Sequence, residues 1–218
     1  MAPDNPMYEP EKWFNRRTAE KCVEALRKNG FTAHYVETRD EAKRIALEAI
    51  PAGASVGIGG SVTVRELGIH ESLKERGNTV YDHWDATLSP AEKVAARDNQ
   101  VRADVFLSST NAVTMDGALV NTDGTGNRVG AMIMGPKVSV VVCGYNKIVP
   151  DVRAAIRRIR RYAAPVNYRR LNANVPCVEG GECDACTSKS CRITTIIEGK
   201  PGAKDQFVVI VVGEKLGY

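Results

Sequence analysis

The chain has 218 residues, of which 43% are hydrophobic and 26% are charged, a length and composition that allow one globular domain with a substantial core. No apolar run approaches the roughly 18 residues that a membrane span requires, and the N-terminus lacks the basic and then apolar layout of a secretory signal. We therefore expect a cytoplasmic protein without a membrane partner. A net charge of +4 is too small to require a nucleic-acid partner.

The first part of the chain alternates helical patterns with short apolar runs. Residues 9–29 and 38–51 have the apolar spacing of helices, and Thr38 and Glu41 form a capping box for the second of them. Residues 31–37, between these two segments, predict a strand. The run ASVGIGG predicts a buried strand that leads into a glycine turn.

The later elements continue this alternation. The predicted strands are 78–82, 103–110, 137–144, 192–198 and 206–214. The predicted helices are 90–103 and 152–163. Because strands alternate with helices, we expect an α/β fold with a mostly parallel sheet and helices on both faces. We interpret residues 1–218 as a single domain, in which residues 167–195 form a cysteine-rich insertion between the last helix and the final strands.

The first glycine turn, GIGGS, follows a predicted strand and precedes a predicted helix. It is not a dinucleotide-binding fingerprint, because Val62 stands where the third glycine would be. Two glycines allow a ligand to approach the backbone, and two hydroxyls lie at a helix N-terminus that suits an anion; these residues are Gly59, Gly60, Ser61 and Thr63. Alternatively, Thr63 and Glu66 form another capping box.

The second glycine turn, DGTGNR at 123–128, has two glycines separated by one residue and followed by Asn and Arg. Such a turn can form a backbone nest for a phosphate or carboxylate, with Arg128 binding the anion through two parallel hydrogen bonds. The alternative is a hairpin turn with a solvated arginine.

Four of the six cysteines lie within fifteen residues, at the spacing C-x5-C-x2-C-x4-C: Cys177, Cys183, Cys186 and Cys191. Thiolates at such spacing select soft metals, so we expect either zinc or an iron–sulfur cluster. The spacing matches neither the two close pairs of a structural zinc site nor the ferredoxin run, and it leaves the metal identity open. The alternative is a set of reduced or disulfide-bonded thiols. Cys22 and Cys143 are predicted to be core residues.

Seven arginines lie between residues 153 and 170. They could contact nucleic acid, form the solvated face of an amphipathic helix, or offset the negative charge of a metal centre or an acidic ligand. We expect only weak binding to nucleic acid near physiological salt.

Three segments together resemble the LUD-domain family of lactate-utilisation proteins: GIGGSVTVRELG, the stretch 103–149 and VVIVVGEKLGY. The resemblance extends from about residue 10 to the end of the chain. It implies a three-layer α/β/α fold like that of the glucosamine-phosphate isomerase, ribose-phosphate isomerase and CoA-transferase group. It also implies a role in the oxidation of L-lactate or a related organic acid, with iron–sulfur partner proteins.

The resemblance further implies a ligand pocket with two walls. The first wall would contain Gly59, Gly60, Ser61, Thr63 and Glu66. The second would contain Asn111, Asn121, Gly124, Gly126, Asn127 and Arg128.

The leading hypothesis is a component of organic-acid oxidation that binds an anionic small molecule and a cysteine-ligated metal. One alternative is an isomerase-like or transferase-like enzyme on a phosphorylated or CoA-linked substrate, with Glu66 as base or nucleophile. Another is a regulatory binding module that uses the arginine-rich helix. The sequence leaves open whether the protein is an enzyme, and it is compatible with a homo-oligomer.

Overall fold

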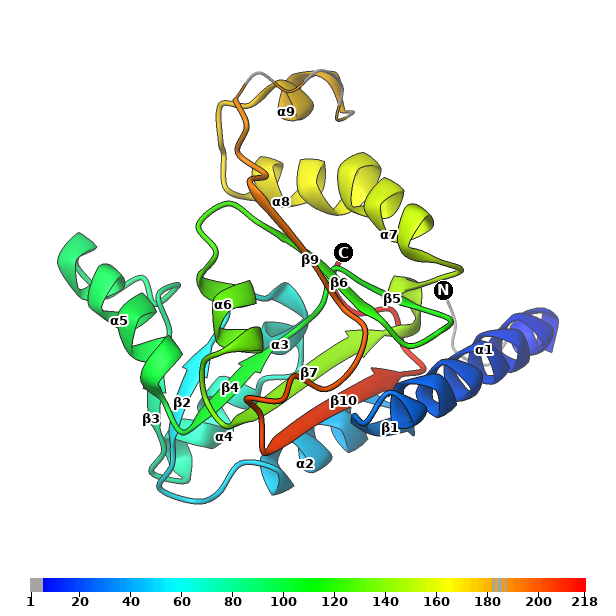
Figure 1. Cartoon of the computed structure of the whole chain (residues 1–218), viewed down its shortest axis with the longest axis horizontal. Helices are drawn as coiled ribbons and strands as arrows, with labels where there is room; N and C mark the ends of the chain where they lie inside the picture. Colours follow the sequence, from blue (N-terminus) through cyan, green and yellow to red (C-terminus); the bar gives the residue numbers. More distant parts are fainter. Residues whose placement is uncertain (1–5, 182, 184–185, 187) are drawn as a thin grey trace.

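The structure is a computed structural model that describes residues 6–181, 183, 186 and 188–218. Its centre is a six-stranded sheet in which every neighbouring pair is parallel, as Figure 1 shows. The strand order is β1 (Thr32–Val36), β10 (Gln206–Val212), β7 (Val138–Gly144), β4 (Val105–Ser108), β2 (Ser55–Ile58) and β3 (Thr79–Tyr81). The prediction of an α/β fold with a mostly parallel sheet is therefore confirmed.

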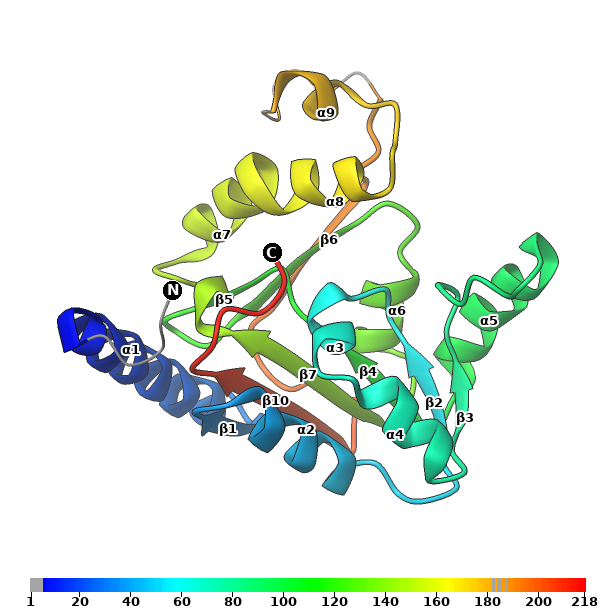
Figure 2. The ribbon, with the colours of Figure 1, turned by 180° about the vertical axis from the view of Figure 1, so that it is seen from behind.

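Helices cover both faces of this sheet. On one face, which Figure 2 brings to the front, lie α2 (Arg39–Glu48), α3 (Val62–Glu66) and α4 (Ile69–Glu75). On the other lie α1 (Glu9–Lys28), α5 (Pro90–Arg102) and α6 (Asn127–Ile133). The two faces bury separate apolar clusters, and the central strands β7 and β10 contribute alternate residues to both.

Local sequence signals explain where several elements begin. The capping box of Thr38 and Glu41 is present, and Ser89 and Glu92 form a second one at the start of α5. Helix α5 can approach β2 closely because Gly57 has no side chain: a Cβ there would lie 2.6 Å from the Cα of Gln100. This contact brings Gln100 into the interior.

A second, four-stranded sheet lies on the α1 and α6 side, and of its strands only the one at 192–198 was predicted. Its order is β8 (Ile148–Val149), β5 (Ala112–Thr114), β6 (Leu119–Asp123) and β9 (Ile193–Ile197). Its outer face packs against the arginine-rich helical segment, which consists of α7 (Val152–Arg158), a π-helical turn (Ile159–Ala163) and α8 (Ala164–Arg170). The predicted helix at 152–163 therefore continues further than expected.

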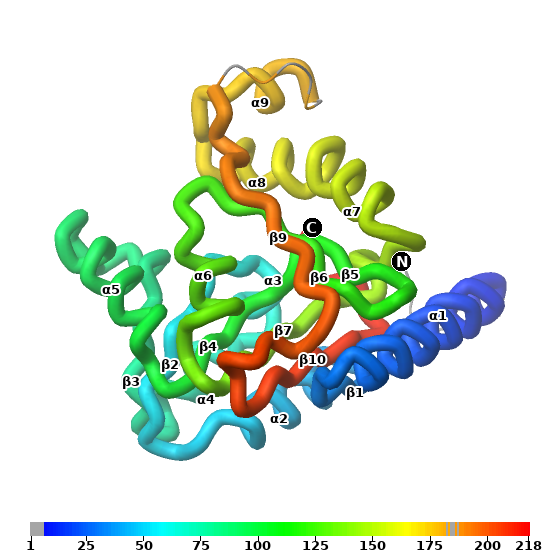
Figure 3. Tube along the Cα trace, viewed as in Figure 1, coloured from blue at the N-terminus to red at the C-terminus, as the bar shows by residue number. Residues whose placement is uncertain are grey.

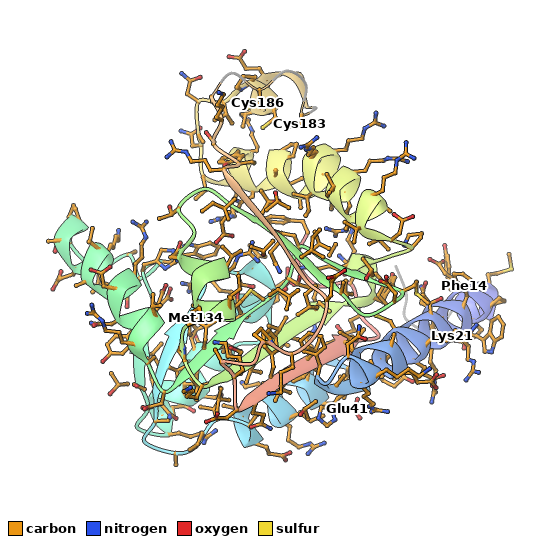
Figure 4. All side chains as sticks on the ribbon, viewed as in Figure 1. Phe14, Lys21, Glu41, Met134, Cys183 and Cys186 are labelled. Atoms are coloured by element: carbon orange, nitrogen blue, oxygen red, sulfur yellow. The ribbon has the colours of Figure 1, made fainter. Side chains whose placement is uncertain are left out.

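The cysteine-rich segment follows α8 and leads into β9, as the tube in Figure 3 shows. It contains α9 (Pro176–Gly180), in which Cys177 is buried. Cys183 and Cys186 are half-buried, and both are labelled in Figure 4. Residues 182, 184, 185 and 187, which belong to the predicted insertion, lie outside the described residues.

Within the described part of the chain, no helix has the length and apolar character needed to cross a bilayer.

Candidate functional site

A cavity of about 410 Å³ lies beyond the carboxyl ends of strands β2, β3, β4 and β7. Ligands of open parallel sheets bind at this edge, and the volume falls within the roughly 300–1,000 Å³ usual for small-molecule sites. The small sheet contributes the end of β6, and the π-helical turn and α8 contribute the opposite side. The cavity therefore lies between the parallel sheet and the arginine-rich helical segment.

Both predicted glycine turns contribute to this cavity. The predicted residues that line it are Gly60, Ser61, Thr63, Asn111, Gly124, Asn127 and Arg128. The other four predicted residues do not line it: Glu66, Gly59, Asn121 and Gly126. The structure thus brings the two turns together, but only part of each faces the cavity.

In the first turn, Ser61 caps α3: its hydroxyl accepts a hydrogen bond of 3.2 Å from the N–H of Val64. The alternative capping box of Thr63 and Glu66 is therefore wrong. Helix α3 has only five residues, so its dipole can contribute little to anion binding. Gly60 is needed for another reason, because a Cβ there would lie 2.6 Å from the ring of Trp84.

Glu66 does not occupy the position expected of a catalytic base. Its side chain is exposed, and its carboxylate accepts a hydrogen bond of 2.8 Å from the N–H of Gly217. Because Glu66 does not line the cavity, the geometry gives it the role of holding the segment around Gly217, and the predicted catalytic role is not supported.

In the second turn, Gly126 precedes α6, so residues 123–128 connect a strand to a helix and do not form the alternative hairpin. The side chain of Arg128 is only 11% exposed. Its guanidinium donates to Asp123 at 3.0 and 2.6 Å, to Asn111 Oδ1 at 2.9 Å, to two backbone carbonyls and to Asn121.

A guanidinium has five N–H groups, and all of them are directed to these partners. Arg128 therefore ties β6, α6 and the loop after β4 together, and it has no free pair of donors for the anion that the sequence analysis assigned to it. Asn111 and Asn121 serve the same network, since the N–H of Asn111 donates to Asn121 Oδ1 at 3.1 Å.

Lys147 was not predicted, yet it is the most unusual charged residue of the cavity. It lies in the 3-10 turn that follows β7 and is only 3% exposed. Its Nζ lies 2.9 Å from Thr63 Oγ1 and 3.0 Å from Ser109 Oγ. Burial lowers the pKa of Lys147 to about 7, so near neutral pH the amine is protonated in only part of the molecules.

His83 and Trp84 form a further wall. Burial lowers the pKa of His83, and the side-chain amide nitrogen of Gln100 lies 2.8 Å from its Nδ1. With Gln100 donating to Nδ1, the proton of the neutral ring is assigned to Nε2. The Trp84 ring has Arg170 at 4.0 Å and Arg65 at 5.4 Å from its centroid.

The cavity has an excess of positive charge. Its lining contains four cationic residues and a single acidic one, Asp123, which is paired with Arg128 at 2.6 Å. Among the described residues, neither Arg97 nor Arg170 has an acidic partner within salt-bridge distance. These two arginines leave uncompensated positive charge for an anionic ligand.

The four clustered cysteines influence one another's pKa. Burial raises the pKa of Cys177, and the charges of Cys183, Cys186 and Cys191 raise it further. Cys191 lines the cavity and lies 3.7 Å from the hydroxyl of Tyr168. Within the described ranges, however, no three or more Cys, His, Asp or Glu side chains are arranged to hold a metal ion. The metal site therefore stays a prediction.

The arginine-rich segment divides into inner and outer residues. Arg158 donates to the carbonyl oxygens of Asn111 at 2.7 Å and Asn146 at 3.2 Å, and Arg170 lines the cavity. Arg170 is itself exposed, and so are the remaining five: Arg153, Arg157, Arg160, Arg161 and Arg169.

Comparison with known proteins identifies the fold and the family. A comparison with curated proteins gave no match. The solved structure of a DUF162 family protein from Deinococcus radiodurans has a TM-score of 0.54 and 17% sequence identity, covering 91% of this chain and 98% of that one; it shows a shared fold. A family model described as LUD domain matches residues 19–212. Because this match spans most of the chain, the protein belongs to the LUD-domain family.

Proposed function

We propose that the protein binds a small carboxylate-bearing molecule in the cavity and acts in the oxidation of lactate or a related organic acid. The observation that carries this proposal is the positive charge of Arg97 and Arg170, which is not compensated by an acidic residue of the cavity, because Asp123 is already paired with Arg128. An anion that enters this cavity meets cations without acidic competitors.

Arg170 is the best candidate for direct recognition of a carboxylate. Its guanidinium lies over the Trp84 ring and donates to Tyr218 Oη at 2.8 Å and Asn167 Oδ1 at 2.9 Å. These contacts fix the plane of the guanidinium and leave it without an ion-pair partner within the described residues. A planar, oriented guanidinium is well suited to a carboxylate.

Membership in the LUD-domain family supports an organic acid as the ligand. The transferase-like alternative loses support, because Glu66, its proposed base, does not line the cavity. A cavity of about 410 Å³ has room for more than a three-carbon acid, so larger acids belong among the candidates.

A thermal-shift panel tests the proposal with the full chain. We expect one or more of L-lactate, longer 2-hydroxy acids and 2-oxo acids to raise the melting temperature, because a ligand that binds only the folded state stabilises it. The corresponding neutral amides, such as lactamide, are the matched controls and should have no effect. Stabilisation by sugar phosphates or CoA esters alone would contradict the organic-acid proposal.

We also propose that Cys177, Cys183, Cys186 and Cys191 hold a metal. The mutual charge effects among these thiols support it, because a cation placed among them would relieve the repulsion between thiolates. A hydrogen bond from Ser188 lowers the pKa of Cys186, which favours the thiolate that metals bind. A bound iron–sulfur cluster would supply electron transfer to a redox partner protein, and zinc would supply a structural crosslink.

A further inference from the structure

Three side chains at the base of the cavity form a connected group that anion binding does not require. Lys147 Nζ lies 3.0 Å from Ser109 Oγ and 2.9 Å from Thr63 Oγ1. All three residues line the cavity. A nucleophilic hydroxyl in hydrogen-bond contact with a base, which a third group orients, is the arrangement that activates serine for attack on an acyl carbon.

The hydroxyl groups of Thr63 and Ser109 have different surroundings. Thr63 is 1% exposed, and the backbone of Gly217 packs so tightly against it that a Cβ on Gly217 would lie 2.5 Å from Thr63 Oγ1. The Thr63 hydroxyl also lies 3.4 Å from the carbonyl oxygen of Leu216. Thr63 is therefore enclosed on the side away from Lys147, which suits a residue that positions the amine.

Ser109 is placed differently. It immediately follows β4 at the carboxyl edge of the sheet, where ligands bind. Its hydroxyl also donates a hydrogen bond of 3.3 Å to the carbonyl oxygen of Thr110. As a primary alcohol at the cavity wall, Ser109 is the better nucleophile of the two.

Both the position and the protonation state of Lys147 suit it to act as the base. Lys147 sits in a short 3-10 turn (Tyr145–Lys147) that begins where the buried strand β7 ends, so its backbone is fixed by the sheet. A lysine must lose its proton to act as a base, and burial of Lys147 favours the neutral amine.

We propose that Ser109, Lys147 and Thr63 form a catalytic group for acyl transfer from an ester or thioester. Ser109 Oγ bonds to the acyl carbon while Lys147 Nζ takes the hydroxyl proton. The bond from carbon to the leaving oxygen or sulfur then breaks, and Lys147 returns the proton to the leaving alkoxide or thiolate. Water, deprotonated by the same amine, releases the acid and restores Ser109.

The charge of the cavity suggests which esters are accepted. Arg97 and Arg170 would favour a substrate that carries a carboxylate or phosphate away from the reacting carbonyl. This activity goes beyond the proposed binding of an organic acid and shares with it the cavity and the two arginines, but not the reacting groups.

A neutral active-site probe tests the inference without depending on anion binding. The full chain is incubated with diisopropyl fluorophosphate, and the adduct is located by intact mass and peptide mapping. We expect one adduct per chain, on Ser109, formed at a rate that rises between pH 6 and pH 8 as Lys147 loses its proton. Because the adduct is mapped on the unaltered protein, the result does not depend on whether a variant folds.

Variants then assign the roles. Ser109→Ala and Lys147→Met should abolish labelling, whereas Ser108→Ala, at the neighbouring serine that does not line the cavity, should label normally. Thr63→Val should slow labelling at least tenfold and move the pH midpoint downward, since the ammonium loses a hydrogen-bond acceptor. Thr63→Ser should restore both the rate and the midpoint.

Absence of an adduct on Ser109 between pH 6 and pH 9 in folded protein, or labelling of Lys147→Met at the unaltered rate, would overturn the inference. Neither result would affect the proposed binding of an organic acid. Conversely, normal labelling of Ser109 in a protein that binds no organic acid would contradict only the proposed function.

Discussion

Lys147 is a charged side chain that the fold keeps almost entirely out of water. Its amine is compensated by two hydroxyls and by no carboxylate within salt-bridge distance in the described chain. Burying an ammonium without a carboxylate is costly, and proteins retain such residues mainly at functional sites. The position of Lys147 at the ligand-binding edge of the sheet is consistent with that rule.

The lowered pKa of Lys147 predicts a pH-dependent stability. In the unfolded chain the amine titrates near 10.5 and in the folded protein near 7, so the unfolded state binds more protons in between. The free energy of unfolding therefore rises with pH from about 7 to 10.5, and this gain is lost again as the pH falls back to 7.

Urea unfolding at pH 7 and pH 9 measures this effect. Between these two values the free energy of unfolding should rise by about 2 kcal/mol more in the unaltered protein than in Lys147→Met. Lys204, whose pKa burial lowers to about 8, contributes equally to both proteins and cancels. Equal pH dependence in the two proteins would show that Lys147 titrates normally.

Replacing Arg128 should affect mainly the stability of the fold. Arg128→Ala leaves the buried Asp123 without its ion-pair partner, and breaking one side of such a pair costs about 3–5 kcal/mol. We expect a large fall in the free energy of urea unfolding. Arg102→Ala, an exposed residue of α5, should change it by less than about 0.5 kcal/mol. A stable Arg128→Ala protein that merely binds its ligand poorly would restore the direct anion-binding role.

The sequence could predict which loops form the cavity, but not the role of each residue in them. Glycine turns after apolar strands identify the ligand-binding edge, so Gly60 and Arg128 were found, whereas Asn111 was found only through the family resemblance. Lys147 follows the most apolar strand, a signal that was present but carries no motif. The occupation of Arg128 by its own neighbours depends on three-dimensional contacts that no local spacing encodes.

At the level of elements, the cavity depends on the close approach of the loop after β3 to the loop after β2. Gly60 has no positive φ, so its backbone tolerates alanine, but the added Cβ would lie 2.6 Å from the Trp84 ring. The ring, held beside Arg65 and Arg170, must then move. The substitution Gly60→Ala therefore tests how the shape of the cavity, and not its charge, affects ligand binding.

Gly60→Ala should change the fluorescence of Trp84 and weaken ligand binding. The measurement uses a Trp13→Phe background, because Trp13 is 63% exposed and would mask the signal. Gly130→Ala, where a Cβ meets nothing within 4 Å, should leave the fluorescence unchanged and stabilise the helix slightly. An unaltered spectrum for Gly60→Ala would mean that Trp84 does not lie over the glycine turn.

The cysteine-rich segment should act as one metal-binding unit. Cys183→Ser combined with Cys186→Ser should release the metal and loosen this segment while the parallel sheet keeps its circular dichroism, because metal binding is coupled to local folding. Ser190→Ala, in the same segment, should retain the metal. Elemental analysis of anaerobically purified protein measures the content, and absorption distinguishes a brown iron–sulfur cluster from colourless zinc.

Full metal content in the double variant, or metal-free unaltered protein after anaerobic purification, would contradict the metal proposal. One zinc ion per chain would support the metal site but would contradict a role of this site in electron transfer.

The elements that the sequence predicts are those with strong local signals. The strands β7 and β10 were found from apolar runs and helix α2 from its capping box, and helix α5 was predicted without the capping residues that the structure shows. Of the small sheet only β9 was found, as the predicted strand 192–198, whereas β5, β6 and β8, which have two to five residues, were missed. Such short strands are stabilised by the helices and sheet around them, and their pairing depends on tertiary contacts.

At the scale of the whole molecule, the small sheet packs with α1, α6 and the parallel sheet in one apolar cluster, and the arginine-rich helical segment packs against its other face (Figure 1). The cavity lies between the parallel sheet and this helical segment. Strand β9 belongs to the small sheet and the next strand, β10, to the large one. This order of strands could not be read from the sequence, because alternating strands and helices allow several orders in the sheet.

The central claim is that Arg97 and Arg170 hold an anion in the cavity. Calorimetric titration of the most stabilising organic acid from the thermal-shift panel, into the unaltered protein and into the Arg97→Gln/Arg170→Gln double variant, tests it most directly. Each hydrogen bond to a charged group contributes about 1.5–3 kcal/mol, so the double variant should bind at least a hundredfold more weakly. The exposed pair Arg102→Gln/Arg169→Gln should bind normally. Equal affinity in the unaltered protein and the Arg97→Gln/Arg170→Gln variant would contradict the account.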